Sequence, residues 1–172
     1  DGLCVDPLPG AIDAFAGGRE MELFGRLSIP LYHGLVVDKH DPIYGNLIGR
    51  NADEVLADPL YQILLEQNPR TLTLLGVQEL SKLPFRPAVL FHDAHFSVIV
   101  VSEGGRVCFL LSDCGYAEVS EAVWQDLDGN ILDCHFRDYK EQPPEYEKAA
   151  RATRIASDFA SSESATGCCK LQ

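Results

Sequence analysis

Hydrophobic residues in the first half of the chain recur every three or four positions, which is the spacing of a helix that buries one face. The pattern predicts three helices, over residues 20–27, from a cap at Asp53 to Leu64, and from a cap at Thr71 or Thr73 to Leu80. Prolines bound these helices, because a proline cannot continue a helix from its interior. Residues 1–18 are rich in Pro and Gly, so we expect an extended leading segment with turns there.

After Pro87 the pattern changes to short apolar runs that are typical of strands. The predicted strands cover residues 89–91, 96–101 and 107–111, and a turn over residues 103–105 joins the last two. Runs as apolar as these predict strands that are covered on both faces. Further elements are expected over residues 119–127 and 131–136.

Helices followed by strands predict an α+β fold. With 172 residues, the chain is long enough to bury a sizeable core as one globular domain. Pro143 and Pro144 precede a stretch rich in Ala, Arg and Glu and then a Ser-rich end. We therefore expect a domain over residues 1–139 and a polar tail, flexible or helical, over residues 140–172.

The formal net charge of −12 at pH 7 excludes nucleic acid as the expected partner, because phosphate binding needs clustered Lys and Arg. An acidic face could instead steer a partner with basic residues, although ordinary solubility explains the charge equally well. The chain has no apolar run of membrane-spanning length and no signal segment at its start. A cytoplasmic location is therefore expected.

The six cysteines do not form a metal-binding or redox motif, because no CxxC spacing occurs. Cys4, Cys108, Cys114 and Cys134 are scattered, and we expect them to be reduced thiols. Neither a metal nor another cofactor is expected.

The predicted hairpin carries candidate chemistry. It presents His95 on its first strand and Ser112 and Asp113 at the end of its second. An imidazole that is oriented by a hydroxyl or carboxylate can activate a nucleophilic thiol, which is otherwise mostly protonated at neutral pH. No cysteine lies at the start of a predicted buried helix early in the chain, so the pattern is half of an active site.

Five motifs follow one another along the chain: Ile29-Pro30-Leu31-Tyr32-His33-Gly34 with Val37-Asp38, Leu72-Thr73 with Gly76 and Glu79-Leu80, His95-Phe96-Ser97, Asp113 with Gly115, and Val123-Trp124 with Leu127. In this order they resemble the MINDY family of deubiquitinases, over roughly residues 2–139. The resemblance implies a papain-like cysteine protease domain, truncated here at its N-terminus, that trims polyubiquitin and favours chains joined through lysine 48 of ubiquitin. The nucleophilic cysteine and the oxyanion-hole glutamine of the family have no counterpart in this sequence.

The resemblance also implies roles for single residues. His95 matches the catalytic base of the family, and Ser112 falls where the family often has a threonine that orients this histidine. Asp113 matches the carboxylate that follows, although it is equally placed to form a turn before Gly115.

The remaining histidines and the tryptophan have structural interpretations. His33 belongs to a family motif but is more simply explained as a residue that shapes a turn. His92 is expected at a strand edge, and His40 and His135 are expected at the surface or in turns. Trp124 is expected in the core.

The tail ends in Cys169-Lys170-Leu171-Gln172, which fits a prenylation box, and Cys168 beside it could carry a palmitoyl group. Two lipids would hold the protein at a membrane surface. Against this, Lys170 is not aliphatic and no polybasic run precedes the box. Residues 146–159 could instead form a ubiquitin-interacting helix.

Two functional hypotheses follow. The first is a cysteine isopeptidase that acts on lysine-48-linked polyubiquitin, with its nucleophile supplied by a missing upstream segment, so that this chain alone would be inactive. The second is a catalytically dead ubiquitin-binding module that a lipidated tail tethers to membranes. Retention of His95 favours the first hypothesis, because a decayed enzyme does not need its base.

Overall fold

The computed structural model describes residues 3, 5–68, 70–116, 119 and 121–138. The chain divides into two compact units. The first comprises Asp1–Leu110 together with Asp126–Asp128, and the second comprises Leu111–Gln125 and Gly129–Gln172. Mixed helices and strands confirm the α+β content that the sequence predicts.

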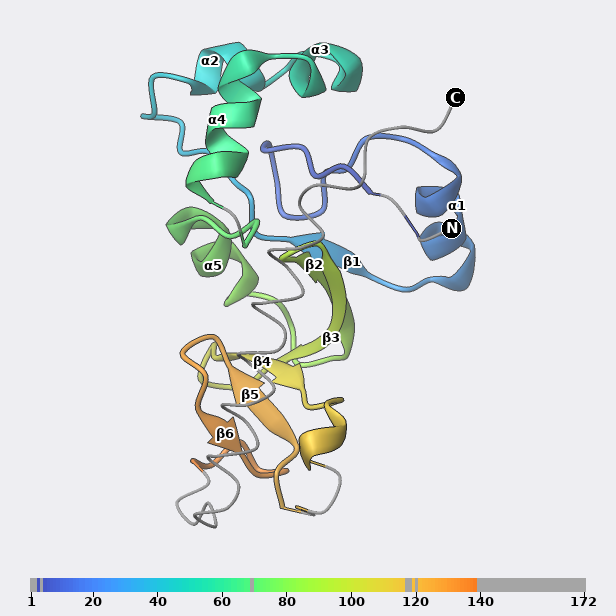
Figure 1. Cartoon of the computed structure of the whole chain (residues 1–172), viewed down its shortest axis with the longest axis vertical. Helices are drawn as coiled ribbons and strands as arrows, with labels where there is room; N and C mark the ends of the chain where they lie inside the picture. Colours follow the sequence, from blue (N-terminus) through green and yellow to red (C-terminus); the bar gives the residue numbers. More distant parts are fainter. Residues whose placement is uncertain (1–2, 4, 69, 117–118, 120, 139–172) are drawn as a thin grey trace. The chain divides into compact units, whose positions relative to one another are not determined.

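The first unit is built on four strands, β1 (Leu31–His33), β2 (Ala88–His92), β3 (His95–Val101) and β4 (Val107–Leu110) (Figure 1). The short β1 runs parallel to β2, whereas β2, β3 and β4 are antiparallel neighbours in chain order. Gly105, at φ 77°, turns the chain between β3 and β4, where a side chain would be strained. The predicted strands and the predicted turn over residues 103–105 are therefore confirmed.

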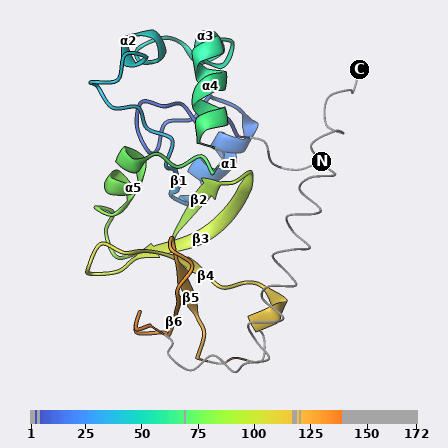
Figure 2. The same ribbon diagram turned by 60° about the vertical axis from the view of Figure 1, so that its left-hand side comes forward.

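One face of this sheet is covered by helix α5 (Leu74–Leu80), which lies beside β1–β3 in both ribbon views (Figures 1 and 2). The core that they form contains Leu80, Ala88, Leu90, Ile99, Val101 and Val107. The opposite face is more open, because the side chains of Val98 and Leu110 are 42% and 41% exposed. The prediction that both faces are covered is therefore wrong at Val98 and Leu110, but it is confirmed at Val100 and Cys108, which are buried on the same face.

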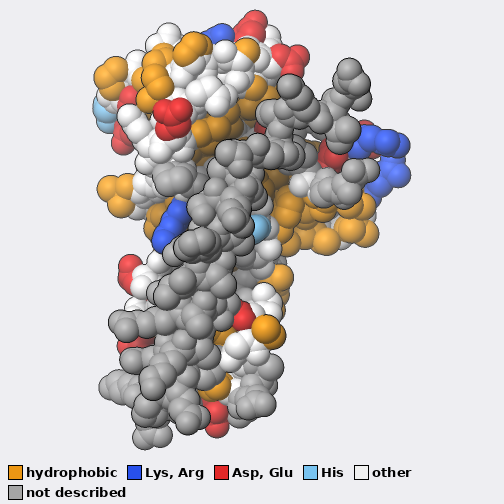
Figure 3. Space-filling view, in the orientation of Figure 1, with side chains coloured by type: hydrophobic (Ala, Val, Ile, Leu, Met, Phe, Trp, Pro, Cys, Tyr) orange, Lys and Arg blue, Asp and Glu red, His pale blue; other side chains and the backbone are white. Residues whose placement is uncertain are grey.

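Helix α1 (Arg19–Leu27) confirms the predicted helix over residues 20–27, but it packs only lightly. The Phe24 ring lies 5.8 Å from the Phe96 ring on the open face of the sheet, and no residue of α1 is fully buried. Leu23 and Leu27 remain exposed, and Figure 3 shows hydrophobic side chains at the surface in this region. Because α1 contacts the sheet so lightly, it leaves this face open at Val98 and Leu110.

A second core gathers three helices, α2 (Tyr44–Leu47), α3 (Ala52–Leu56) and α4 (Pro59–Gln67), around Leu35, Val37, Leu47, Val55, Tyr61 and Leu64. The predicted single helix capped by Asp53 is wrong, because two helices with separate caps replace it. Asn51 accepts a hydrogen bond from the Glu54 amide at 2.9 Å. Asp58 accepts one from the Leu60 amide at 2.9 Å.

The break follows from Pro59, which has no amide hydrogen and therefore fits the first turn of a new helix rather than the interior of a longer one. Arg50 joins the pieces. Its guanidinium contacts the carboxylate of Asp58, the N-cap of α4, and donates to the carbonyl of Glu54 in α3 at 3.2 Å.

Strand β1 and helix α5 meet at an unusually close backbone contact. A Cβ atom added to Gly76 would lie 1.8 Å from the Gly34 carbonyl oxygen, so only glycine fits there. Thr73 is the N-cap of α5, as one of the two predicted alternatives, and accepts from the Gly76 amide at 3.1 Å. The same hydroxyl donates to the Val36 carbonyl at 2.7 Å, so the cap also fastens α5 to the chain that follows β1.

His33, on β1, is fully buried and holds the leading segment against the sheet. Its Nε2 hydrogen-bonds the Ala14 carbonyl at 2.7 Å, and its Nδ1 accepts from the Leu35 amide at 3.0 Å. The Phe15 ring meets it edge-on at 4.8 Å. Burial lowers the pKa of His33 to about 4, so the imidazole is neutral at pH 7. This histidine therefore has a structural role, beyond the turn-shaping role predicted for it.

In the second unit, a short helix η1 (Cys114–Tyr116) precedes a hairpin that pairs Trp124 with Leu132 and Gln125 with Ile131. The strands of this hairpin are β5 (Trp124–Asp126) and β6 (Ile131–Leu132). The Trp124 ring stacks on the Phe136 ring at 5.5 Å and is only half-buried, so the prediction of a core tryptophan is not met.

Among the described residues, no helix has both the length and the apolar character that crossing a membrane requires. The predicted tail, with the candidate lipidation residues Cys168 and Cys169 and the predicted helix over residues 146–159, lies outside the described residues, as does Cys4.

Candidate active site at the β2–β3 hairpin

The β2–β3 hairpin turns through only two residues, Asp93 and Ala94, at φ 49° and 57°. Two successive positive φ angles are typical of the tight turn whose twist matches that of antiparallel strands. The Asp93 amide donates to the Arg70 carbonyl at 3.2 Å, which ties the turn to the loop before α5. As a result, His92 and His95 form the first residue pair after the turn.

His95 is exposed at the start of β3, whereas the far end of the same strand, Ile99–Val101, is buried. Within the described residues its ring makes no hydrogen bond and no ion pair. A general base must reach a reacting group and accept a proton from it. An imidazole that is exposed and whose ring nitrogens have no hydrogen-bond partner meets this requirement.

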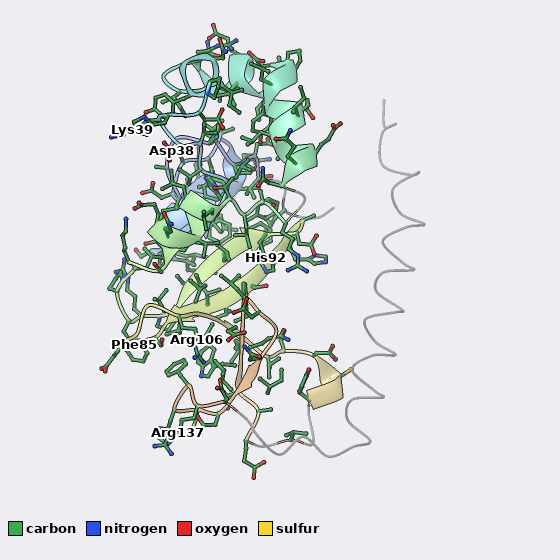
Figure 4. The ribbon with its side chains drawn as sticks, turned by 90° about the vertical axis from the view of Figure 1, so that its left-hand side faces the viewer. Asp38, Lys39, Phe85, His92, Arg106 and Arg137 are labelled. Carbon is green, nitrogen blue, oxygen red and sulfur yellow. The ribbon has the colours of Figure 1, made fainter. Side chains whose placement is uncertain are left out.

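The neighbouring His92 is half-buried and held on two sides. Its Nε2 lies 3.1 Å from the Ser97 Oγ, and its ring lies 4.7 Å from the Phe109 ring. Burial is the main cause that lowers the pKa of His92; nearby Asp93 opposes this effect, and His95 and Arg70 add to it. Figure 4 labels His92 at the hairpin. This arrangement was not predicted from the sequence, although strand alternation places positions 92, 95 and 97 on one face once the turn is located.

Ser112 and Asp113 belong to the second unit, and both are exposed. The Asp113 Oδ1 accepts from the Gly115 amide at 2.7 Å, and its backbone carbonyl accepts from the Tyr116 amide at 3.0 Å. Asp113 therefore forms a turn at the start of η1, which was one of its two predicted roles. Since His95 belongs to the first unit, the predicted pairing of His95 with Ser112 or Asp113 stays a prediction.

The described cysteines are free thiols, as predicted for Cys108, Cys114 and Cys134. Cys108 is buried in β4, and burial raises its pKa to about 11, so it remains protonated at pH 7. Cys114 and Cys134 are exposed, the first in a single helical turn and the second in a turn after β6. Of the residues that the structure describes, no three His, Cys, Asp or Glu side chains are grouped to hold a metal ion.

His40 and His135 lie exposed in turns, as predicted. Their backbone amides donate to the side chains of Asp38 and Asp133, each at 2.8 Å, so the turns are set by the aspartates rather than by the imidazoles. His40 and His135 thus differ from His92, whose ring makes contacts of its own.

The sequence matches a family model described as MINDY deubiquitinase over residues 50–140, just over half of the chain. It is also similar to three curated proteins. Ubiquitin carboxyl-terminal hydrolase MINDY-1 of Danio rerio is 26% identical over 160 residues, covering 79% of this chain and 31% of that protein. Ubiquitin carboxyl-terminal hydrolase MIY1 of Saccharomyces cerevisiae is 27% identical over 156 residues, covering 74% and 42%.

Ubiquitin carboxyl-terminal hydrolase MINDY-2 of Homo sapiens is 26% identical over 182 residues, covering 92% of this chain and 29% of that protein. The chain thus spans between 29% and 42% of the length of these relatives. The family match contains the hairpin with His95 and the segment with Ser112 and Asp113. On this evidence, the chain belongs to the MINDY deubiquitinase family.

Proposed function

We propose that this chain is the histidine-bearing part of a cysteine isopeptidase that cleaves polyubiquitin and prefers lysine-48-linked chains. The observation that carries the proposal is the family match over residues 50–140, which includes His95. The exposure of His95 at the hairpin turn supports it, because the base must reach both a thiol and a substrate. The fold assigned to the complete domain under this proposal is papain-like.

In the proposed reaction, His95 takes the proton of a cysteine thiol, and the thiolate attacks the carbonyl carbon of the isopeptide bond. His95 then gives that proton to the departing lysine amine, which leaves a thioester between the cysteine and ubiquitin. Water next attacks the thioester while His95 accepts a proton from the water. The free carboxylate of ubiquitin leaves, and the proton returns to the cysteine sulfur.

The nucleophile is proposed to come from outside these 172 residues. Cys108 is a poor candidate because it is buried and its pKa is raised to about 11. Cys114 and Cys134 lie in turns rather than at the start of a buried helix. The relatives are more than twice as long as the part that matches, so they have ample sequence for a further catalytic segment.

Ser112 is the proposed orienter of His95. Its hydroxyl can accept from a ring N–H and so fix the tautomer of the imidazole. Asp113 is the second choice, because its Oδ1 already accepts from the Gly115 amide. In the complete protein, Ser112→Ala is expected to slow cleavage at least tenfold, whereas Ser112→Thr keeps the hydroxyl and is expected to retain most of the rate.

The testing experiment begins with the transcript upstream of Asp1. We expect it to encode a glutamine followed within several residues by Cys-Pro, and the complete protein to cleave lysine-48-linked ubiquitin dimers faster than lysine-63-linked dimers. A complete protein that has this cysteine but cleaves neither dimer would overturn the proposal.

A second function is a ubiquitin-binding module that lipids on Cys169 and Cys168 hold at a membrane surface. It is favoured by one observation, that none of the described cysteines is placed as a nucleophile. An in-frame start without an upstream cysteine would support it, together with binding of lysine-48-linked chains by the 172-residue protein. Loss of the protein from the membrane fraction in a Cys169→Ser variant would separate lipid tethering from ubiquitin binding.

A further inference from the structure

Two histidines lie side by side on one face of the hairpin. His92 is the last residue of β2 and pairs directly with His95, the first residue of β3. Residues that oppose each other directly in an antiparallel pair point to the same face and lie close enough for their side chains to interact. The register therefore makes the two imidazoles neighbours.

The two imidazoles differ in how firmly they are held. His92 reaches diagonally across β3, where its Nε2 lies 3.1 Å from the Ser97 Oγ. Its ring also packs against Phe109 on β4, at 4.7 Å and an interplanar angle of 49°. Two contacts on two different strands fix the orientation of the His92 ring, whereas His95 is exposed.

Three charged or titratable groups face His92. They are Asp93 in the turn, His95 on β3 and Arg70 on the neighbouring loop. Burial lowers the pKa of His92, and the positive charges of His95 and Arg70 lower it further, against the opposing effect of Asp93. A neutral ring can therefore stay beside His95 when His95 takes up a proton.

We propose that His92 is a positioning residue for His95: its anchored ring limits one side of the space open to the His95 side chain and so sets the direction of that imidazole. This inference rests on the proposed function, in which His95 is the base. The role proposed for His92 is to act through His95, without contact to the substrate. Ser97 contributes to this positioning, because its hydroxyl holds the His92 ring in place.

The test substitutes Ser97, the hydrogen-bond partner of His92, so that both histidines keep their side chains. Ser97→Ala removes the hydroxyl that holds His92, and Ser97→Thr keeps a hydroxyl at the same position and suits a strand. The measurement is the set of histidine ring resonances in ¹H–¹³C spectra of the 172-residue protein. We expect Ser97→Ala to move the His95 ring signals toward those of the exposed His40, and Ser97→Thr to restore them.

A reciprocal measurement uses His95→Gln, which removes a titrating neighbour of His92. Because the charge of His95 lowers the pKa of His92, this change is expected to raise the titration midpoint of His92. The expected rise is roughly half a pH unit, the size that Coulomb's law gives for partly hydrated charges at cross-strand distance. His40→Gln is the matched control and is expected to leave that midpoint unchanged.

The proposal would be overturned if the His95 ring signals stay in place in the Ser97→Ala variant. It would also be overturned if His95→Gln leaves the titration midpoint of His92 unchanged. If Ser97→Ala instead disrupts the backbone amide signals of β2 and β3, His92→Phe replaces it, since Phe keeps the packing on Phe109 but loses the hydrogen bond. That variant is expected to move the His95 ring signals in the same direction, and unmoved signals would overturn the proposal. None of these measurements needs cleavage, so their failure is separate from a failure of the proposed function.

Discussion

His33 lies on β1 and His95 lies on β3 of the same sheet, but the surroundings of the two imidazoles are opposite in kind. His33 is fully buried, and each of its ring nitrogens has a hydrogen-bond partner. His95 is exposed, and within the described residues its ring has no hydrogen-bond partner. An imidazole with both nitrogens bonded cannot take up a proton without losing a bond, whereas an uncommitted one can. Two histidines in motifs of one family can therefore be needed for different reasons, His33 for packing and His95, under the proposed function, for chemistry.

The surroundings of the two histidines sharpen this difference. Around His33 the chain is held by contacts that tolerate no change, since Gly76 touches the Gly34 carbonyl and Thr73 bonds both α5 and Val36. Among the described residues, few contacts surround His95, and its neighbour with a fixed ring orientation is His92. We expect substitutions in the first region to affect folding and substitutions in the second to affect activity.

Gly76→Ala is expected to have the largest effect on folding. The added Cβ would lie 1.8 Å from the Gly34 oxygen, so α5 must move away from β1 and expose the core that contains Leu80. We expect a loss of more than about 3 kcal/mol in the free energy of unfolding, measured by urea denaturation. Gly45→Ala is the control, because nothing lies within 4 Å of the added atom. Equal stability of the two variants would refute the close contact.

His33→Gln tests the buried histidine through pH. Since burial lowers its folded pKa to about 4 from 6.5, the unfolded chain takes up a proton at a higher pH than the folded chain. The contribution is fully present above pH 6.5 and is lost as the pH falls toward 4. Stability of the unchanged protein should therefore drop by up to about 3 kcal/mol over that window.

His33→Gln removes this titration. We expect the variant to be less stable by roughly 2 kcal/mol at pH 7, because glutamine cannot satisfy both the Ala14 carbonyl and the Leu35 amide. Its stability should also change less between pH 7 and pH 4. Parallel curves for the two proteins would contradict the role given to His33.

Thr73→Val should have an intermediate effect. Valine keeps the shape of threonine but loses the hydroxyl that caps α5 and donates to the Val36 carbonyl. We expect a loss of about 1–2 kcal/mol by thermal or urea unfolding. The matched control is Ser81→Ala, which removes an exposed hydroxyl bond to Gln78 and should cost less than about 0.5 kcal/mol. Comparable losses in both variants would mean that Thr73 has no special role.

His95→Ala is expected to have the smallest effect on stability, under about 0.5 kcal/mol, because the side chain is exposed. The free energy of unfolding of the 172-residue protein gives the test. A loss of 2 kcal/mol or more would show that His95 is a structural residue like His33, and the comparison between the two histidines would then fail.

Periodicity located most elements of the first unit, because the buried face of each helix or strand repeats with a fixed period. It could not show that the helix after Asn51 ends before Asp58, since both pieces continue one apolar stripe and only the two caps reveal the break. It also could not show the open face near Val98 and Leu110, because an apolar residue reads the same whether or not another element covers it.

The site was only partly predictable. His95 follows from its motif, but the turn at Asp93 and Ala94 carries no Asn-Gly signature, so the direct pairing of His95 with His92 was not expected. The alternatives for Asp113 came from its position before Gly115, and the observed turn is one of them. The bond between His92 and Ser97 depends on strand register, which a motif does not specify.

The proposed role of His95 as the base is tested most directly by cleavage of lysine-48-linked ubiquitin dimers, measured for the complete protein and its His95→Ala variant, with His40→Ala as the matched control. We expect His95→Ala to lower the rate at least a thousandfold while the protein stays folded, and His40→Ala to cleave at the unchanged rate. Cleavage by a folded His95→Ala variant at a rate near that of the unchanged protein would contradict the claim that His95 is the base.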